Sequence, residues 1–125
     1  MRVLGIDYGA KRVGIAISDE AGSFAFPVET VATKDALARI RSLIDERGIA
    51  EIAMGDTRSY GSVANPVTGE AEAFADTLMR ETGLPLALVF EAGSSIESTR
   101  YTEGKGHDDA SAAAIILQRH LDAKQ

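Results

Sequence analysis

Two short apolar runs with a tight turn between them open the chain. Residues 3–6 form the first run, and a β-branched run over residues 13–17 forms the second. The glycine-containing segment 9–11 between them is typical of a turn that joins two strands. The pattern predicts two buried strands, with Asp7 at the end of the first.

A third strand is expected directly after the second. Residues 19–22 contain two acids and a glycine and predict a hairpin turn. Residues 23–31 then form a run interrupted by Pro27, which cannot donate a ladder hydrogen bond and therefore favours an edge strand. The chain is expected to open with three antiparallel strands.

A helix and a buried strand follow. Apolar residues recur at helical spacing over residues 34–47, at Leu37, Ile40 and Ile44. Thr33 is the expected N-cap of this helix, and Gly48 is its expected stop. Residues 49–55 then predict a buried strand.

A polar loop over residues 56–64 leads to Asn65-Pro66, a capping residue followed by a proline suited to the first helical position. The helix that begins there carries one apolar stripe, made of Val67, Ala71, Phe74 and Leu78. Residues 83–85 end the helix. Residues 86–90 predict a short strand that runs directly into Glu91.

The last third of the chain predicts helices. Residues 94–103 are compatible with a short helix, residues 103–107 form a glycine-rich basic loop, and residues 109–123 predict an apolar helix with an acidic first turn. The element order is βββαβαβαα. This order predicts an α/β fold, a five-stranded mixed sheet with helices on both faces.

Composition narrows the class of protein. The chain has 125 residues, which suits one domain over residues 1–125, and no apolar run approaches the roughly 18 residues of a membrane span. It has no cysteine, and no basic and apolar leader precedes the first strand, so a cytoplasmic location is expected. The net charge of −6 requires any contact with nucleic acid to be local.

Acidic residues are expected to meet at one edge of this sheet. Asp7 and Glu91 end two strands, and Asp108 and Asp109 begin the last helix. Carboxylates converging from distant positions suit Mg²⁺, and two such ions support phosphoryl transfer. Taken singly, each acid has an ordinary alternative as a helix cap or a surface residue, and either Asp108 or Asp109 can be the cap.

Basic and aromatic side chains in the neighbouring loops are candidates for contacts to nucleic acid, although such residues are often plain surface. They are Lys11, Arg12, Arg58, Tyr60, Lys105 and His107.

Two segments resemble a known family. Residues 4–19 (Leu-Gly-Ile-Asp-Tyr-Gly-Ala-Lys-Arg-Val-Gly-Ile-Ala-Ile-Ser-Asp) resemble the opening signature of the YqgF (RuvX) family, and residues 105–118 resemble its last motif. The resemblance implies an RNase H-like nuclease dependent on Mg²⁺ or Mn²⁺, with Asp7, Glu91 and Asp109 in the three acidic catalytic positions. It implies Holliday junction DNA or precursor 16S rRNA as substrate.

The middle of the chain departs from that family. It has Gly-Asp-Thr-Arg at residues 55–58, where the family usually has Gly-Leu-Pro. At residues 90–95 only Glu91 is retained from an Asp-Glu-Arg-Leu-Thr-Thr motif. One alternative is therefore a catalytically silent module that binds nucleic acid or regulates.

An actin-like sugar kinase, which shares an Asp-x-Gly turn, is disfavoured because it needs two domains around its nucleotide. A symmetric junction would favour a homodimer, and no self-complementary patch identifies one.

Overall fold

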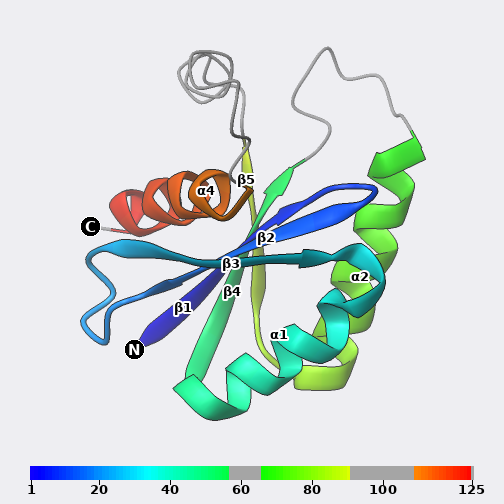
Figure 1. Cartoon of the computed structure of the whole chain (residues 1–125). Helices are drawn as coiled ribbons and strands as arrows, with labels where there is room; N and C mark the ends of the chain where they lie inside the picture. The colour runs from blue at the N-terminus through cyan, green and yellow to red at the C-terminus, as the bar shows by residue number, and fades with distance from the viewer. Residues whose placement is uncertain (57–65, 91–108, 125) are drawn as a thin grey trace.

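The computed structural model describes residues 1–56, 66–90 and 109–124, without the side chains of residues 56, 66–68 and 90. Strands and helices alternate along most of these residues after an opening set of three strands (Figure 1). The strands are β1 (Arg2–Tyr8), β2 (Arg12–Ser18), β3 (Ala25–Ala32), β4 (Ile49–Asp56) and β5 (Leu86–Phe90), and the helices are α1 (Thr33–Arg47), α2 (Pro66–Thr82) and α4 (Asp109–Ala123).

The strands form one mixed sheet in the order β3-β2-β1-β4-β5. β1, β2 and β3 pair antiparallel, whereas β4 is parallel to β1 and β5 is parallel to β4. The carboxyl ends of β1, β4 and β5 therefore share one edge of the sheet, which is where ligands bind in folds of this kind. The predicted mixed sheet is confirmed.

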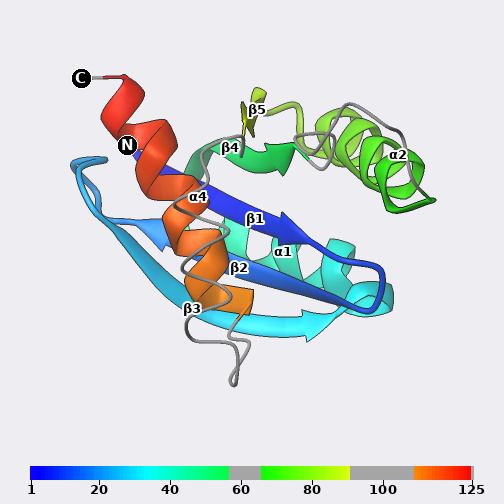
Figure 2. The ribbon, with the colours of Figure 1, turned by 90° about the horizontal axis from the view of Figure 1, so that it is seen from above.

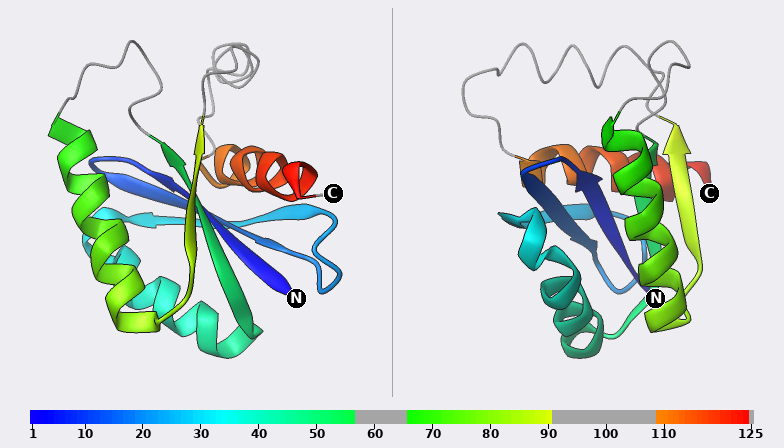
Figure 3. Two further views of the ribbon diagram at one scale, coloured as in Figure 1. Left: turned by 180° about the vertical axis from the view of Figure 1, so that it is seen from behind. Right: turned by 90° about the vertical axis from the view of Figure 1, so that its right-hand side faces the viewer.

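The helices cover both faces of the sheet, as the sequence predicts. Figures 2 and 3 show α4 on one face and both α1 and α2 on the other. None of the described helices is long and apolar enough to cross a membrane.

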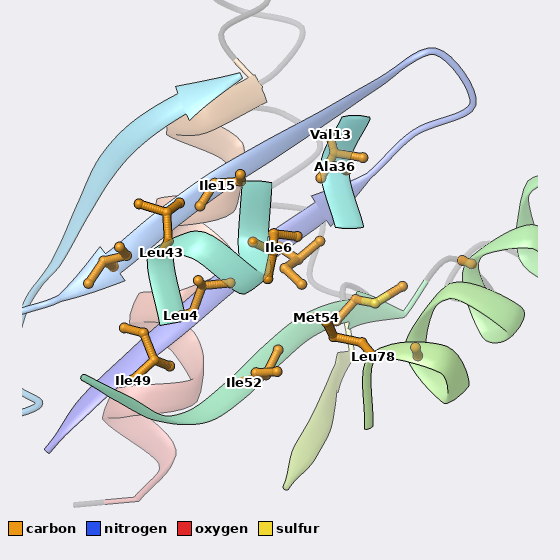
Figure 4. Packing of buried hydrophobic residues seen from close by; sticks show 14 residues of the cluster. Leu4, Ile6, Val13, Ile15, Ala36, Leu43, Ile49, Ile52, Met54 and Leu78 are labelled. Carbon is orange, nitrogen blue, oxygen red and sulfur yellow. The ribbon is translucent and has the colours of Figure 1, made fainter. Parts of the chain in front are cut away.

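Alternation along the strands divides the core into two clusters. The larger cluster joins the sheet to α1 and α2 and contains Leu4, Ile6, Ile15 and Ile52 (Figure 4). The smaller cluster joins the sheet to α4 through Val3, Ala16, Ala53 and Val89 from the strands and Ala113, Ile116, Leu117 and Leu121 from the helix. Odd-numbered residues of β1 thus face α4, which places Asp7 on the face that this helix covers.

The edge strand and the first helix show where local signals were sufficient. Pro27 lies in β3 at the outer edge, beside a register shift in its pairing with β2, as its missing N–H requires. Gly48 ends α1 with a φ of 64°, in the left-handed region that favours glycine. Both predictions are confirmed.

The predicted cap of α1 is wrong. Ala32 holds the N-cap position, and the hydroxyl of Thr33 donates to the carbonyl oxygen of Gly9 at 2.8 Å. The backbone N–H of Thr33 donates to the carbonyl oxygen of Lys11 at 3.0 Å. Thr33 therefore ties the start of α1 to the β1–β2 turn instead of capping the helix. The expected helix over residues 94–103 and the Asn65 cap lie outside the described residues.

A cluster of charges fastens the end of α4 to β4, near the start of that strand. Glu51 is 13% exposed, and its two carboxylate oxygens contact His120 at 2.5 Å and Lys124 at 2.6 Å. Burial raises the pKa of Glu51, but the hydrogen bonds from Lys124 and His120 outweigh burial, so the pKa lies below its ordinary value. The folded state therefore favours ionised Glu51.

We expect Glu51→Gln to lower the free energy of unfolding by on the order of 1 kcal/mol at neutral pH, because it removes the charge that His120 and Lys124 contact. Since folding lowers the pKa of Glu51, this contribution is full above the ordinary Glu value of 4.5 and is lost as the pH falls through the lower folded value. Urea unfolding of both proteins across this range should show their difference shrinking with acidification.

Glu46→Gln is the matched control. Glu46 is 59% exposed and lies 4.0 Å from Arg39, so its loss should change the free energy of unfolding by less than about 0.5 kcal/mol. A difference between wild type and Glu51→Gln that persists unchanged into acid would contradict the role given to the Glu51 charge.

Candidate active site

Asp7 lies at the carboxyl edge of the sheet, directly before the last residue of β1. Val3 and Gly5 precede it on the same face, and both of them meet α4. In the antiparallel ladder Asp7 pairs with Gly14 of β2. Cross-strand partners share a face, so Gly14 also faces α4.

Gly14 is the point at which α4 touches the sheet. A Cβ built on Gly14 would lie 1.9 Å from the carbonyl oxygen of Asp109, the first residue of α4. Only a residue without a side chain permits this approach. Because Gly14 also pairs with Asp7, the backbone of Asp109 and the side chain of Asp7 are brought to the same point of the sheet.

The carboxylate of Asp109 is held by a basic residue of β2. The Nε atom of Arg12 donates to Oδ2 of Asp109 at 3.0 Å. Arg12 lies two residues before Gly14 on the same strand and therefore on the same face. Its side chain is 59% exposed, against 24% for Asp109. The contact thus joins an exposed arginine side chain to a partly buried carboxylate.

The β1–β2 turn brings Lys11 to this edge, and Tyr8, at the end of β1, packs on the opposite face of the sheet. Lys11 is exposed in the turn next to Arg12. Tyr8 faces α2, where its ring centroid lies 5.1 Å from that of Phe74. Burial, with the nearby charge of Glu70, raises the pKa of Tyr8, so this phenol stays neutral and serves as packing.

The other parallel strands end at the same edge. Gly55 pairs with Val89 and Asp56 pairs with Phe90, so β4 and β5 finish together, and Glu91 follows β5 directly in the sequence. The sequence placed Asp56 in the following loop, whereas β4 extends to include it. The structure adds an acidic residue to the strand ends at this edge.

Of the site residues predicted from the sequence, the structure describes Asp7, Asp109, Lys11 and Arg12 and gathers them around the β1–β2 turn and the start of α4. The remaining candidates lie outside the described residues: Glu91, Asp108, Arg58, Tyr60, Lys105 and His107. Within residues 1–56, 66–90 and 109–124, no three acidic or histidine side chains are grouped to hold a metal ion. Two of the three predicted catalytic acids belong to this part of the chain.

Sequence reasoning missed the role of Gly14. The signal was present, because a glycine stands inside an otherwise β-branched strand, and such a residue often marks close approach of another backbone. The partner segment begins 95 residues later, at Asp109, and no local pattern identifies it.

Comparison with protein families and relatives supports a nuclease site. A family model described as "RuvX: Holliday junction resolvase" matches residues 1–123. A protein of Leifsonia xyli subsp. xyli is 36% identical over 133 residues, which cover 98% of this chain and 86% of that protein. A protein of Geobacillus kaustophilus is 35% identical over 138 residues, which cover all of both chains. Both are named "Putative pre-16S rRNA nuclease".

Solved structures share the fold. RuvC of T. thermophilus, in complex with a Holliday junction substrate, superposes with a TM-score of 0.64 at 21% identity and covers 99% of this chain and 95% of that chain. The Fowlpox virus resolvase bound to Holliday junction DNA gives a TM-score of 0.60 at 10% identity, with 99% of each chain covered. At these identities the likeness concerns the fold, and it confirms the predicted RNase H-like sheet.

We expect Gly14→Ala to destabilise the protein by about 1–3 kcal/mol, because the new methyl group would meet the carbonyl oxygen of Asp109 and displace the first turn of α4. Gly69→Ala is the control, since nothing lies within 4 Å of a Cβ at that position of α2. It should stabilise the protein by about 0.5–1 kcal/mol through helix propensity. Urea unfolding measures both, and equal effects would show that the contact at Gly14 is not tight.

Proposed function

The chain belongs to the RuvX family of Holliday junction resolvases, and from this premise we propose that it is a divalent-metal-dependent endonuclease that cleaves phosphodiester bonds in a structured nucleic acid. The family resemblance of residues 4–19 and 105–118 is confirmed, and with it the nuclease class. The observation that carries the proposed mechanism is the meeting of Asp7 and the start of α4 at Gly14.

The donor set suits Mg²⁺ or Mn²⁺. Asp7 and Asp109 supply carboxylate oxygens, and the close approach at Gly14 forces the two residues together although they are far apart in the sequence. Hard divalent cations prefer such ligands. We propose that Asp7, Glu91 and Asp109 hold the metal, with Asp108 as a further ligand. Divalent ions held by these residues would supply activation of the attacking water and stabilisation of the leaving oxygen of a phosphodiester.

The residues of the chain bind and orient the substrate around this centre. Lys11 is exposed in the β1–β2 turn, beside the proposed acidic site, where it can contact a backbone phosphate. We propose the same positioning role for Arg12, Arg58, Lys105 and His107, and a stacking role for the ring of Tyr60. Such contacts read the phosphate backbone rather than sequence, which suits a nuclease that recognises the shape of its substrate.

Two substrate classes follow from the names of the relatives. The family is described by Holliday junction resolution, and the relatives by pre-16S rRNA. A panel containing four-way junction DNA, duplex DNA and a structured rRNA precursor, assayed with Mg²⁺ and with Mn²⁺, decides between them.

Three further expectations stay predictions: one domain over residues 1–125, a cytoplasmic location and a homodimer. The homodimer has a geometric motive, because cutting a symmetric junction on two strands needs two copies of one site. Sedimentation of the protein with and without junction DNA measures it.

We expect Glu91→Gln and Asp7→Asn to abolish cleavage in Mg²⁺ while the protein still binds nucleic acid. Each substitution keeps the shape of the side chain and removes a charge that we propose holds the metal. Ca²⁺ in place of Mg²⁺ should likewise permit binding without turnover, because it tolerates looser geometry. Gel-shift and cleavage assays on the same substrates measure the two properties separately.

Cleavage by Glu91→Gln at the wild-type rate would contradict the assignment of the metal ligands. If the wild-type protein binds the nucleic acids of the panel and cleaves none of them with either metal, the alternative of a catalytically silent module is favoured instead.

We expect Lys11→Ala to weaken binding to all sequences alike and to reduce the salt dependence of binding by about one charge. Arg80→Ala is the control, because Arg80 lies in the last turn of α2, away from the carboxyl edge, and is also exposed. Its removal should leave the salt slope unchanged. Titrations at several salt concentrations measure both slopes, and equal slopes for wild type and Lys11→Ala would place the phosphate contacts elsewhere.

A further inference from the structure

Arg12 contacts the carboxylate of Asp109, which is also one of the proposed metal ligands. We propose that Arg12 occupies the carboxylate of Asp109 while the site holds no metal and releases it when a cation binds, so that its guanidinium becomes available to a substrate phosphate only in the loaded enzyme. The inference rests on the proposed function, since it takes Asp109 as a metal ligand. It adds a coupling between metal loading and substrate binding.

The backbone around Asp109 is fixed, which confines the exchange to side chains. The carbonyl oxygen of Asp109 lies against Gly14, where not even a Cβ fits. Arg12 and Gly14 belong to the same strand, so the distance between the backbones of Arg12 and Asp109 is set by the sheet. The carboxylate can therefore exchange Arg12 for a cation by side-chain rotation alone, without moving α4.

The contact is of the kind that a cation can displace. It joins the Nε atom of Arg12 to one oxygen of Asp109 at 3.0 Å, and the arginine side chain is 59% exposed. Exposed ion pairs of this kind shift an equilibrium constant by no more than about fivefold. Arg39 shows the contrast within the same chain, since it donates to both oxygens of Glu29 at 2.8 and 3.0 Å.

Competition between Arg12 and a cation for Asp109 predicts that removing Arg12 and removing Lys11 have different effects on metal binding, although each removes one positive charge. Removing Arg12 frees Asp109 and should tighten metal binding, although it removes a proposed substrate contact. Lys11 is the neighbouring cation, and it is exposed in the turn. Removing Lys11 should weaken substrate binding in the same way and leave metal affinity unchanged.

The first test is calorimetric titration of Mn²⁺ into wild type, Arg12→Gln, Lys11→Gln and Asp109→Asn, with no nucleic acid present. Arg12→Gln should bind Mn²⁺ about 1.5- to 5-fold more tightly than wild type, as expected for the loss of an exposed competing ion pair. Lys11→Gln should match wild type, and Asp109→Asn should bind Mn²⁺ more weakly.

The outcomes separate the inference from the proposed function. Equal Mn²⁺ affinities for wild type and Arg12→Gln overturn the inference alone, as does an equal gain in Lys11→Gln, which would reduce the effect to net charge. Failure of every protein to bind Mn²⁺ overturns the metal site and the inference with it.

The second test observes the guanidinium directly by NMR of arginine Nε–H groups, with Mg²⁺ because it is diamagnetic. On addition of Mg²⁺ the Arg12 resonance should shift and exchange faster with water, and in Asp109→Asn it should do so without metal. The Arg39 resonance is the internal reference, because its contact with Glu29 lies between β3 and α1 and should not respond. An Arg12 resonance that is unchanged by Mg²⁺ in wild type overturns the inference.

Discussion

The backbone contact between the first residue of α4 and Gly14 of β2 is the constraint on which the site depends. It fixes where the last helix meets the sheet, and Gly14 pairs with Asp7. A second glycine sets the course of the helix, since a Cβ on Gly5 would lie 2.7 Å from the Cβ of Leu117. Two missing side chains on adjacent strands thus allow α4 to lie low over the sheet and carry its acidic first turn to the strand ends.

The two faces of the sheet differ in the size of the side chains that they bury. The face under α1 and α2 is lined by large branched residues such as Leu4, Ile6 and Ile15 and forms the larger core. The face under α4 is lined by small residues such as Ala16 and Ala53, and α4 contributes several alanines. Small side chains lower the cohesion of a core but permit close approach of backbones. The fold therefore keeps most of its apolar burial away from the face that carries the acids.

Most elements could be predicted from the sequence because their signals are local. Periodicity, prolines and helix-ending glycines placed every described strand and helix to within a few residues, and the strand over residues 86–90 and the helix over residues 109–123 agree with β5 and α4. Tertiary contacts were not predictable in this way. Thr33 has the residue type of a cap, yet its hydroxyl bonds to Gly9, because the turn offers it a carbonyl oxygen.

The site shows the same division. Asp7 and Asp109 were identifiable as acids at element ends, and Lys11 and Arg12 as cations in a turn. The pairing of Arg12 with Asp109 joins residues separated by 97 positions, and only the packing of α4 on β2 reveals it. Sequence reasoning gave Arg12 one role, toward phosphate, whereas the structure shows that a carboxylate of the same site already engages it.

An acidic protein can direct nucleic acid to one edge because charges act over a limited range. The net charge of −6 repels a polyanion as a whole, but at physiological salt this repulsion is largely screened beyond about 8 Å. Within that range the local charges decide, and the cations at this edge are Lys11 in the β1–β2 turn and Arg12 at the start of β2. As long as Arg12 is paired with Asp109, the attraction at this edge is reduced. If a cation takes over Asp109, as we propose, it adds positive charge and frees Arg12, so the edge should attract phosphate most strongly when the site is loaded with metal.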